Sequence, residues 1–259
     1  MENSNTSTTK YRMVAFDLDG TLLAPNHKIS DYAVQYLRSL HARGFIVSIA
    51  TGRSPAAIAE VIRRLNFEFP KPHSKSFPVV STNGAKGLHV SHEVFDDEGG
   101  QKELTWETNP MVDGRMNITE LFHQPVPLDL ARKTLNLAKS LGCVTNYYID
   151  HEIYAQIIED WNLEATEKYS RLTGVKFTYC EDDYEEAMDR GLPSKLLVLC
   201  EPDAIDTIHQ KIEAALGHEA KVIRGSPPFF VEILNKEVCK GNGLELLCKK
   251  LRVGLDECM

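Results

Sequence analysis

The sequence predicts an α/β fold in which a doubly wound parallel sheet carries an inserted α+β domain. Three observations lead to this prediction. Short apolar runs alternate with helix patterns over residues 10–85, a polar cluster follows each apolar run, and the pattern changes after Asn83 to a broken, mixed one. Ligands of parallel sheets bind at the carboxyl ends of the strands, so the clusters "DLDGT", "TGR" and "NGA" indicate one shared site.

The first three strands are predicted over "MVAFDL", "FIVSIA" and "FPVVSTNG", which are short apolar runs typical of strands buried on both faces. A helix between the first two is predicted to begin at the N-cap Ser30 and to end at Gly44. A second helix has Ser54 at its cap and Pro55 in its first turn. This order of strands and helices implies right-handed crossovers between parallel strands.

The later elements follow the mixed pattern of a separate domain inserted into the first. Helices are predicted over 128–142, 162–174 and 202–217, and strands over 143–150, 152–157, 174–179, 194–201 and 220–225. Residues 229–235 are expected to return to the first sheet as a strand, followed by a helix over 240–251. The predicted segments are a flexible tail at 1–9, a first core segment at 10–85, an inserted domain at 86–224 and a second core segment at 225–259.

Composition argues against several classes of protein. The 259 residues carry a formal net charge of −8, whereas nucleic-acid binding needs a basic face. No apolar run is long enough to span a bilayer, and the polar start "MENSNTSTTK" has no apolar core of a signal peptide. The six cysteines lack CxxC spacing and are interpreted as reduced thiols. We therefore expect a cytoplasmic protein without nucleic-acid or membrane partners.

The first polar cluster places two carboxylates at the end of a strand. Alternation along an extended chain points Asp17 and Asp19 the same way, and Gly20 permits the turn that follows. Two neighbouring carboxylates repel each other unless a cation is near, and Mg²⁺ prefers oxygen ligands together with substrate phosphate. One carboxylate can then attack phosphorus while the other transfers a proton. The alternative is a capping or turn-forming pair without catalytic function.

These residues carry a family resemblance. "DLDGTLL", "ATGR", "NGA" and "FFVEILNKEVCKG" resemble, in order, the motifs of haloacid dehalogenase (HAD) superfamily phosphatases of the Cof-like group, which have a large α/β cap domain. The resemblance extends from Tyr11 to about Leu255. It implies that the inserted domain is the cap and that the first domain is the catalytic core.

The resemblance also implies roles for individual residues. Asp17 would be the nucleophile and Asp19 the general acid and base, and both would be metal ligands for Mg²⁺. Thr51 and the Gly52 amide would hold phosphoryl oxygens. Lys240 would stabilise the negative charge of Asp17 and the phosphate; a cation at a helix start is otherwise unfavourable.

Other residues keep two interpretations. Arg53 would either meet the substrate or pair with a surface acid. Asn83 would either contact the ligand or shape the turn with Gly84. Lys195, in "PSK", is interpreted as the start of a cap strand and not as the motif lysine. Three cap tyrosines are candidates for selecting the substrate, but the sequence does not orient them: Tyr147, Tyr148 and Tyr154.

The C-terminal segment departs from the family pattern. In the family, the helix after the motif lysine is followed by a strand with a glycine–aspartate motif and an asparagine–aspartate pair, whereas "RVGLDECM" follows here. Asp256 and Glu257 do not replace these acids. We therefore expect a truncated chain, an incomplete Rossmann-like core with an uncovered sheet edge, and weakened Mg²⁺ binding.

The leading prediction is Mg²⁺-dependent hydrolysis of a small-molecule phosphomonoester, a sugar phosphate or nucleotide-related compound, through an aspartyl-phosphate intermediate. The expected partner is thus a small phosphorylated metabolite. One alternative is a catalytically impaired phosphate-binding or regulatory protein, because the last acidic motif is missing. A second alternative is a phosphomutase, which would transfer the phosphoryl group to another hydroxyl instead of to water.

Overall fold

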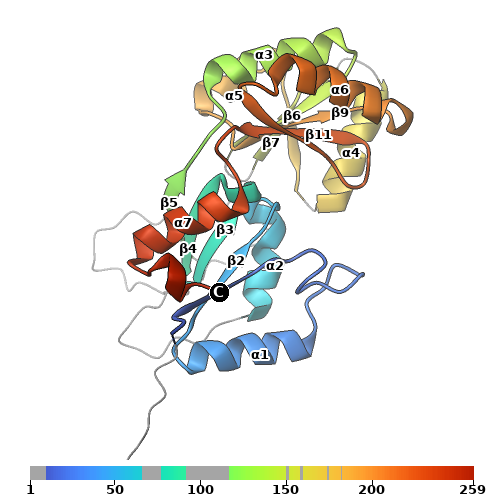
Figure 1. Ribbon diagram of the computed structural model, residues 1–259. Coiled ribbons are helices and arrows are strands. Elements are labelled where there is room, and N and C mark those ends of the chain that lie inside the picture. The colour runs from blue at the N-terminus through green and yellow to red at the C-terminus, as the bar shows by residue number, and fades with distance from the viewer. Residues whose placement is uncertain are drawn as a thin grey trace, which may run out of the picture.

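The computed structural model describes residues 10–65, 77–91, 117–149, 152–157, 160–173, 175–181 and 183–259. These residues form two units, each built on one sheet (Figure 1). The strand order is β1-β2-β3-β4-β5 in the first sheet and β10-β11-β9-β6-β7-β8 in the second. The predicted α/β class is confirmed. None of the described helices is both long enough and apolar enough to cross a membrane.

The first sheet has three parallel strands and two antiparallel ones. Helices α1 and α2 pack on one face of this sheet, and α7 packs on the other, as in a doubly wound fold. The side chain of Ser30 accepts a hydrogen bond from the Ala33 amide and caps α1 as predicted. The elements of this unit are β1 (Met13–Phe16), α1 (Asp31–Ala42), β2 (Ile46–Ala50), α2 (Pro55–Leu65), β3 (Phe77–Ser81), β4 (Lys86–Ser91), β5 (Asn117–His123) and α7 (Lys240–Leu251).

The second sheet is mixed and has helices on both faces. Helices α3, α5 and α6 cover one face, whereas α4 and Ala57 of the first unit's helix α2 pack on the other. The elements are α3 (Leu128–Ser140), β6 (Val144–Ile149), β7 (Glu152–Ala155), α4 (Asp160–Thr173), β8 (Phe177–Tyr179), α5 (Glu185–Arg190), β9 (Lys195–Leu199), α6 (Ile205–Leu216), β10 (Ala220–Arg224) and β11 (Phe230–Asn235).

Two predicted domain boundaries are wrong. Strands β4 and β5, expected in the inserted domain, extend the first sheet, because a turn at Thr82–Gly84 folds β4 back along β3. Strand β11, expected in the core, pairs with β9 and β10 in the second sheet. The β3–β4 and β10–β11 pairings have one cause: strands joined by a short connection pair as antiparallel neighbours. Strand β5 then pairs with the other side of β4. The chain thus passes between the units at residues 124–127 and 236–239, and the predicted tail at 1–9 lies outside the described residues.

The last residues lie along β1. The Arg12 and Ala15 amides donate to the carbonyls of Glu257 and Met259 at 2.9 and 2.8 Å, and the Met259 amide donates to the Met13 carbonyl at 3.0 Å. Residues 257–259 therefore run beside β1 on the side away from β2 (Figure 1). The expectation that this sheet edge is uncovered is wrong for residues 12–15, because the turn at Leu255–Glu257 brings the chain back to it.

Candidate active site

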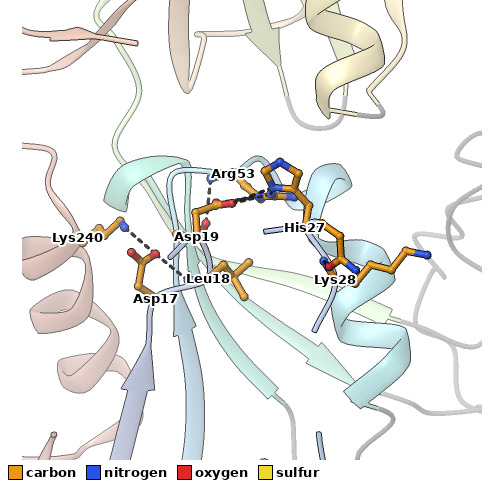
Figure 2. Close-up of polar contacts among 9 residues, drawn as sticks. Asp17, Leu18, Asp19, His27, Lys28, Arg53 and Lys240 are labelled. Carbon is orange, nitrogen blue, oxygen red and sulfur yellow. Dashed lines mark hydrogen bonds and ion pairs between the residues drawn. The ribbon is translucent and has the colours of Figure 1, made fainter. Parts of the chain in front are cut away.

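The first ion pair of the site joins the end of β1 to the start of α7. Asp17 Oδ1 accepts hydrogen bonds from the Leu18 amide and from Lys240 Nζ, both at 2.8 Å (Figure 2). The sulfur of the N-cap Cys239 accepts from the Asn242 amide at 3.3 Å and fixes the first turn of α7. A cation at a helix N-terminus opposes the helix dipole, and the Asp17 carboxylate compensates for it. The fold therefore brings together two residues that are 223 positions apart.

The second ion pair joins Asp19 to Arg53. Arg53 Nε donates to Asp19 Oδ2 at 2.9 Å and Nη2 donates to Oδ1 at 2.6 Å, so the ion pair is bidentate (Figure 2). The hydrogen bond from Arg53 holds the pKa of Asp19 below its ordinary value and outweighs the opposing effect of partial burial. Of the two interpretations of Arg53, the structure shows a pairing with an acid, and this acid is the second aspartate of the first motif.

His27 joins this pair and was missed by the sequence analysis. Its Nδ1 lies 3.3 Å from Arg53 Nη2 and 3.8 Å from Asp19 Oδ1. Guanidinium nitrogens only donate, so Nδ1 accepts in this arrangement. His27 has a backbone φ of +57°, in a turn closed by two hydrogen bonds: the Ala24 amide donates to the Lys28 carbonyl, and the His27 amide donates to the Ala24 carbonyl. The Pro-Asn pair before His27 is a local signal for a turn, but nothing in it shows that the turn folds back on the first motif and brings His27 to Asp19.

The loop after β2 carries the second polar cluster. Thr51 is completely buried, and its hydroxyl accepts a hydrogen bond from the Arg53 amide at 3.2 Å. The Thr51 amide donates to the Val80 carbonyl at 2.9 Å, which ties this loop to β3. Thr51 and Gly52 thus lie at the carboxyl end of β2, next to the residue that binds Asp19.

The third polar cluster forms the turn after β3. Thr82, Asn83 and Gly84 all have positive φ angles, of 52°, 57° and 109°. A Cβ on Gly84 would lie 2.1 Å from the Cys239 carbonyl oxygen, so only glycine fits against the start of α7. Asn83 shapes this turn, as one of its two interpretations predicted. Its side chain also contacts the second unit, where Nδ2 donates to Glu232 Oε2 at 2.7 Å.

The three clusters therefore meet at one end of the first sheet, beside the start of α7. A family model of haloacid dehalogenase-like hydrolases matches residues 14–105 and 115–259. The chain belongs to this family. The predicted family and its hydrolase class are thus confirmed.

Known proteins similar to this hydrolase span nearly its whole length. A protein of Streptococcus pyogenes serotype M6, provisionally named a phosphatase, is 26% identical over 249 residues, which are 96% of this chain and 79% of the relative. An HMP-PP phosphatase of an Enterobacter species is 21% identical, covering 96% and 76%. The fold is shared with a haloacid dehalogenase-like hydrolase from Bacteroides thetaiotaomicron, with a TM-score of 0.71, 19% identity and coverage of 96% and 80% of the two chains.

The carboxylates of this hydrolase offer a metal ion an incomplete set of ligands. Both described contacts of the Asp17 side chain go to Oδ1, and Oδ2 has no partner among the described residues. Both oxygens of Asp19 bind Arg53. In the described part of the chain, no three His, Cys, Asp or Glu residues come together as a metal site. Asp17 therefore fits a hard cation such as Mg²⁺, whereas the Asp19 carboxylate in this arrangement does not.

The candidate cap residues lie on different faces of the second sheet. Tyr147 and Tyr154 belong to the core beneath α3, α5 and α6. Tyr148 lies on the opposite face, and its ring centroid is 5.0 Å from Lys195 Nζ. Lys195 begins β9, as its interpretation predicted, and binds Glu232; the lysine that contacts Asp17 is Lys240.

Proposed function

We propose that this hydrolase cleaves a small-molecule phosphomonoester by transfer of the phosphoryl group to Asp17. The observation that supports this proposal is the contact of Lys240 with only one oxygen of Asp17. That contact leaves Oδ2 as the atom able to attack phosphorus, while the ammonium group offsets the charge of the incoming phosphate. The half-exposed side chain of Asp17, 38% accessible, leaves room for a substrate.

Asp19 is proposed to carry the proton in both steps. Asp17 Oδ2 forms a bond to phosphorus as the ester P–O bond breaks, and Asp19 donates a proton to the leaving oxygen. Asp19 then takes a proton from a water molecule that attacks the aspartyl-phosphate, which releases phosphate and restores Asp17. Arg53 hinders protonation of Asp19 in the present arrangement, so its guanidinium is proposed to move to the phosphoryl oxygens when substrate binds.

The remaining residues are proposed to hold the phosphate. Thr51, Gly52 and Asn83 lie on two loops that hydrogen-bond to each other, since the Asn83 amide donates to the Thr51 carbonyl at 2.9 Å. Asp17 would hold Mg²⁺, which would supply additional positive charge to offset the negative charge of the phosphoryl group. A sugar phosphate or a nucleotide-related compound is the proposed substrate class. Relatives named HMP-PP phosphatase and sugar phosphatase support this choice.

A second candidate function is phosphate binding without turnover. It is favoured by the engagement of both Asp19 oxygens with Arg53, which leaves that carboxylate neither protonated nor free. If Arg53 does not leave Asp19 when phosphate binds, the chain would hold phosphate but not hydrolyse its esters.

Asp17→Asn tests the proposal, because it keeps the shape of the side chain and removes its nucleophilic oxygen. We expect wild-type protein with Mg²⁺ to hydrolyse p-nitrophenyl phosphate and the variant to be slower by about 10⁴-fold or more. Chelation of Mg²⁺ should abolish the wild-type rate. Equal rates for the two proteins would overturn the proposal. Binding of inorganic phosphate without any turnover would favour the second candidate.

A further inference from the structure

A buried ion pair lies on the inward face of the second sheet. Lys195 Nζ donates to Glu232 Oε1 at 3.0 Å, and the two side chains are only 3% and 11% exposed. Glu232 of β11 pairs with Leu197 of β9, so Lys195, two residues before Leu197, is its diagonal neighbour on the same face. This face also packs against Ala57 of α2, which belongs to the first unit.

Each member of the pair has a second partner in the first unit. Glu232 Oε2 accepts from Asn83 Nδ2 at 2.7 Å, and Lys195 Nζ donates to the Gly52 carbonyl at 3.4 Å. The pair therefore contacts both loops to which phosphate binding is assigned above. Among the described hydrogen bonds of Asn83, the one to Glu232 is the only one made by its side-chain nitrogen Nδ2.

Asn83 transmits this contact to Gly52. A Cβ built on Gly52 would lie 2.6 Å from Asn83 Oδ1, so the side-chain amide rests directly on the Gly52 backbone. The backbone of Asn83 is held in the left-handed region by its neighbours in the turn. With the backbone fixed, the Glu232 carboxylate determines which edge of the amide faces Gly52.

The charges of the buried ion pair favour one orientation of the Asn83 side-chain amide. Burial alone would lower the pKa of Lys195, but the Glu232 carboxylate and Tyr169 together outweigh it, and the pKa lies above its ordinary value. The ammonium and the Asn83 amide nitrogen both donate, and the carboxylate offers one acceptor oxygen to each. A glutamine at 232 would have only one acceptor oxygen and would turn a donor toward one of the two donors.

We propose that Lys195 and Glu232 are positioning residues for the phosphate-binding loops, and that Glu232 acts through Asn83. The inference rests on the proposed function, because it assigns a support to the same phosphate site. Its consequence is that the site has its full affinity only when the second sheet is seated on the Gly52 and Asn83 loops.

A double-mutant cycle of Glu232→Gln and Asn83→Ala tests the inference. The readouts are the dissociation constant of inorganic phosphate by calorimetry, and KM and kcat for p-nitrophenyl phosphate. We expect Glu232→Gln to weaken phosphate binding and to raise KM by about 10-fold, with a smaller change in kcat, since Asp17 and Lys240 are untouched. In the Asn83→Ala background the same change should have no further effect, because the linking side chain is gone.

Two controls separate positioning from stability. Tyr147→Phe removes a 2.9 Å hydrogen bond to the Gly191 carbonyl on the opposite face of the same sheet, and should leave phosphate affinity unchanged. Lys195→Met combined with Glu232→Leu replaces the buried pair by apolar side chains, which proteins often tolerate without loss of stability. This variant should keep a melting temperature close to that of the wild type but bind phosphate about 10-fold more weakly.

The outcomes distinguish this inference from the proposed function. Wild-type affinity in Glu232→Gln and in the apolar double variant, or independent effects of Glu232→Gln and Asn83→Ala, would overturn the inference alone. Wild-type protein that binds phosphate but lacks turnover would overturn hydrolysis alone, and the phosphate dissociation constants would still decide the positioning role. A wild-type chain without phosphate affinity would overturn both.

Discussion

Two lysine–carboxylate pairs of similar length differ in their exposure to solvent. Lys240 and Asp17 lie 2.8 Å apart with side chains 39% and 38% exposed, whereas Lys195 and Glu232 lie 3.0 Å apart and are 3% and 11% exposed. We call Lys240–Asp17 the open pair and Lys195–Glu232 the closed pair. Water screens the charges of the open pair, so its atoms can exchange partners with a charged ligand at low cost in free energy. The closed pair has no such freedom, because separating buried charges is costly.

The difference in exposure suits the two lysine–carboxylate pairs to different roles. The open pair lies where proposed substrate atoms arrive, and it is suited to respond to them. The closed pair lies in the second sheet and is proposed to position two loops of the first unit, since each of its members has a further partner there. Removing one member of the closed pair should therefore lower mainly the free energy of unfolding, whereas removing one member of the open pair should lower mainly kcat.

The largest effect is expected when one member of the closed pair is removed. Lys195→Met leaves the Glu232 carboxylate buried without its ammonium partner, which should cost about 3–5 kcal/mol of unfolding free energy. Urea denaturation followed by circular dichroism measures this loss. Adding Glu232→Leu should restore most of it, since no buried charge then remains. A single variant as stable as the wild type would contradict the contrast between the pairs.

Lys240→Met should show the opposite behaviour. Its removal takes a positive charge from the proposed nucleophile, and kcat for p-nitrophenyl phosphate should fall about 10²-fold. The unfolding free energy should change by less than about 1 kcal/mol, because the pair is half exposed. Lys249→Met is a matched control on the same helix, where the lysine pairs with Glu245 at 2.6 Å in a more exposed position. It should leave kcat within twofold of wild type, which a steady-state assay decides.

Much of the core was predictable because its signals are local. The cap of α1 at Ser30 and the alternation of strands and helices are short-range patterns, and they gave the class and the first crossovers. The predicted boundaries of the second unit were wrong because they depend on which strands pair with each other. The mostly apolar run of β11 fits a buried strand in either sheet, and only its short connection to β10 favours the second.

The site was predictable to the extent that the family motifs mark it. Asp17 and Lys240 were singled out from their motifs, and the structure brings them into contact. His27 and Glu232 were not singled out, for different reasons. His27 follows a Pro-Asn turn signal, but the residue types do not show that this turn brings His27 to Asp19. Glu232 lies in a strand assigned to the wrong sheet, so its contact with Asn83 across the two units had no basis in the sequence pattern.

The smallest expected effect concerns the Asp19–Arg53 contact. Arg53 lowers the pKa of Asp19 from the ordinary value of 3.8, so Arg53→Met should raise it. A carboxyl with a lowered folded-state pKa adds stability above the unfolded-state value, and this stability is lost as the pH falls through the folded-state pKa. The wild type should therefore exceed the variant in stability at pH 5 and above, by less than about 1 kcal/mol because Asp19 is half exposed, and the difference should vanish at lower pH.

Carboxyl-carbon NMR titration of Asp19 in the ligand-free protein measures this shift directly. Arg64→Met is the matched control, since Arg64 forms a 2.6 Å ion pair with the exposed Asp31 on α1. That change should leave the Asp19 titration in place. An unshifted Asp19 in Arg53→Met would mean that the guanidinium does not hold this carboxylate in solution. Asp19 would then be free to take up its proton without the proposed movement of Arg53, and the main observation that favours phosphate binding without turnover would lose its force.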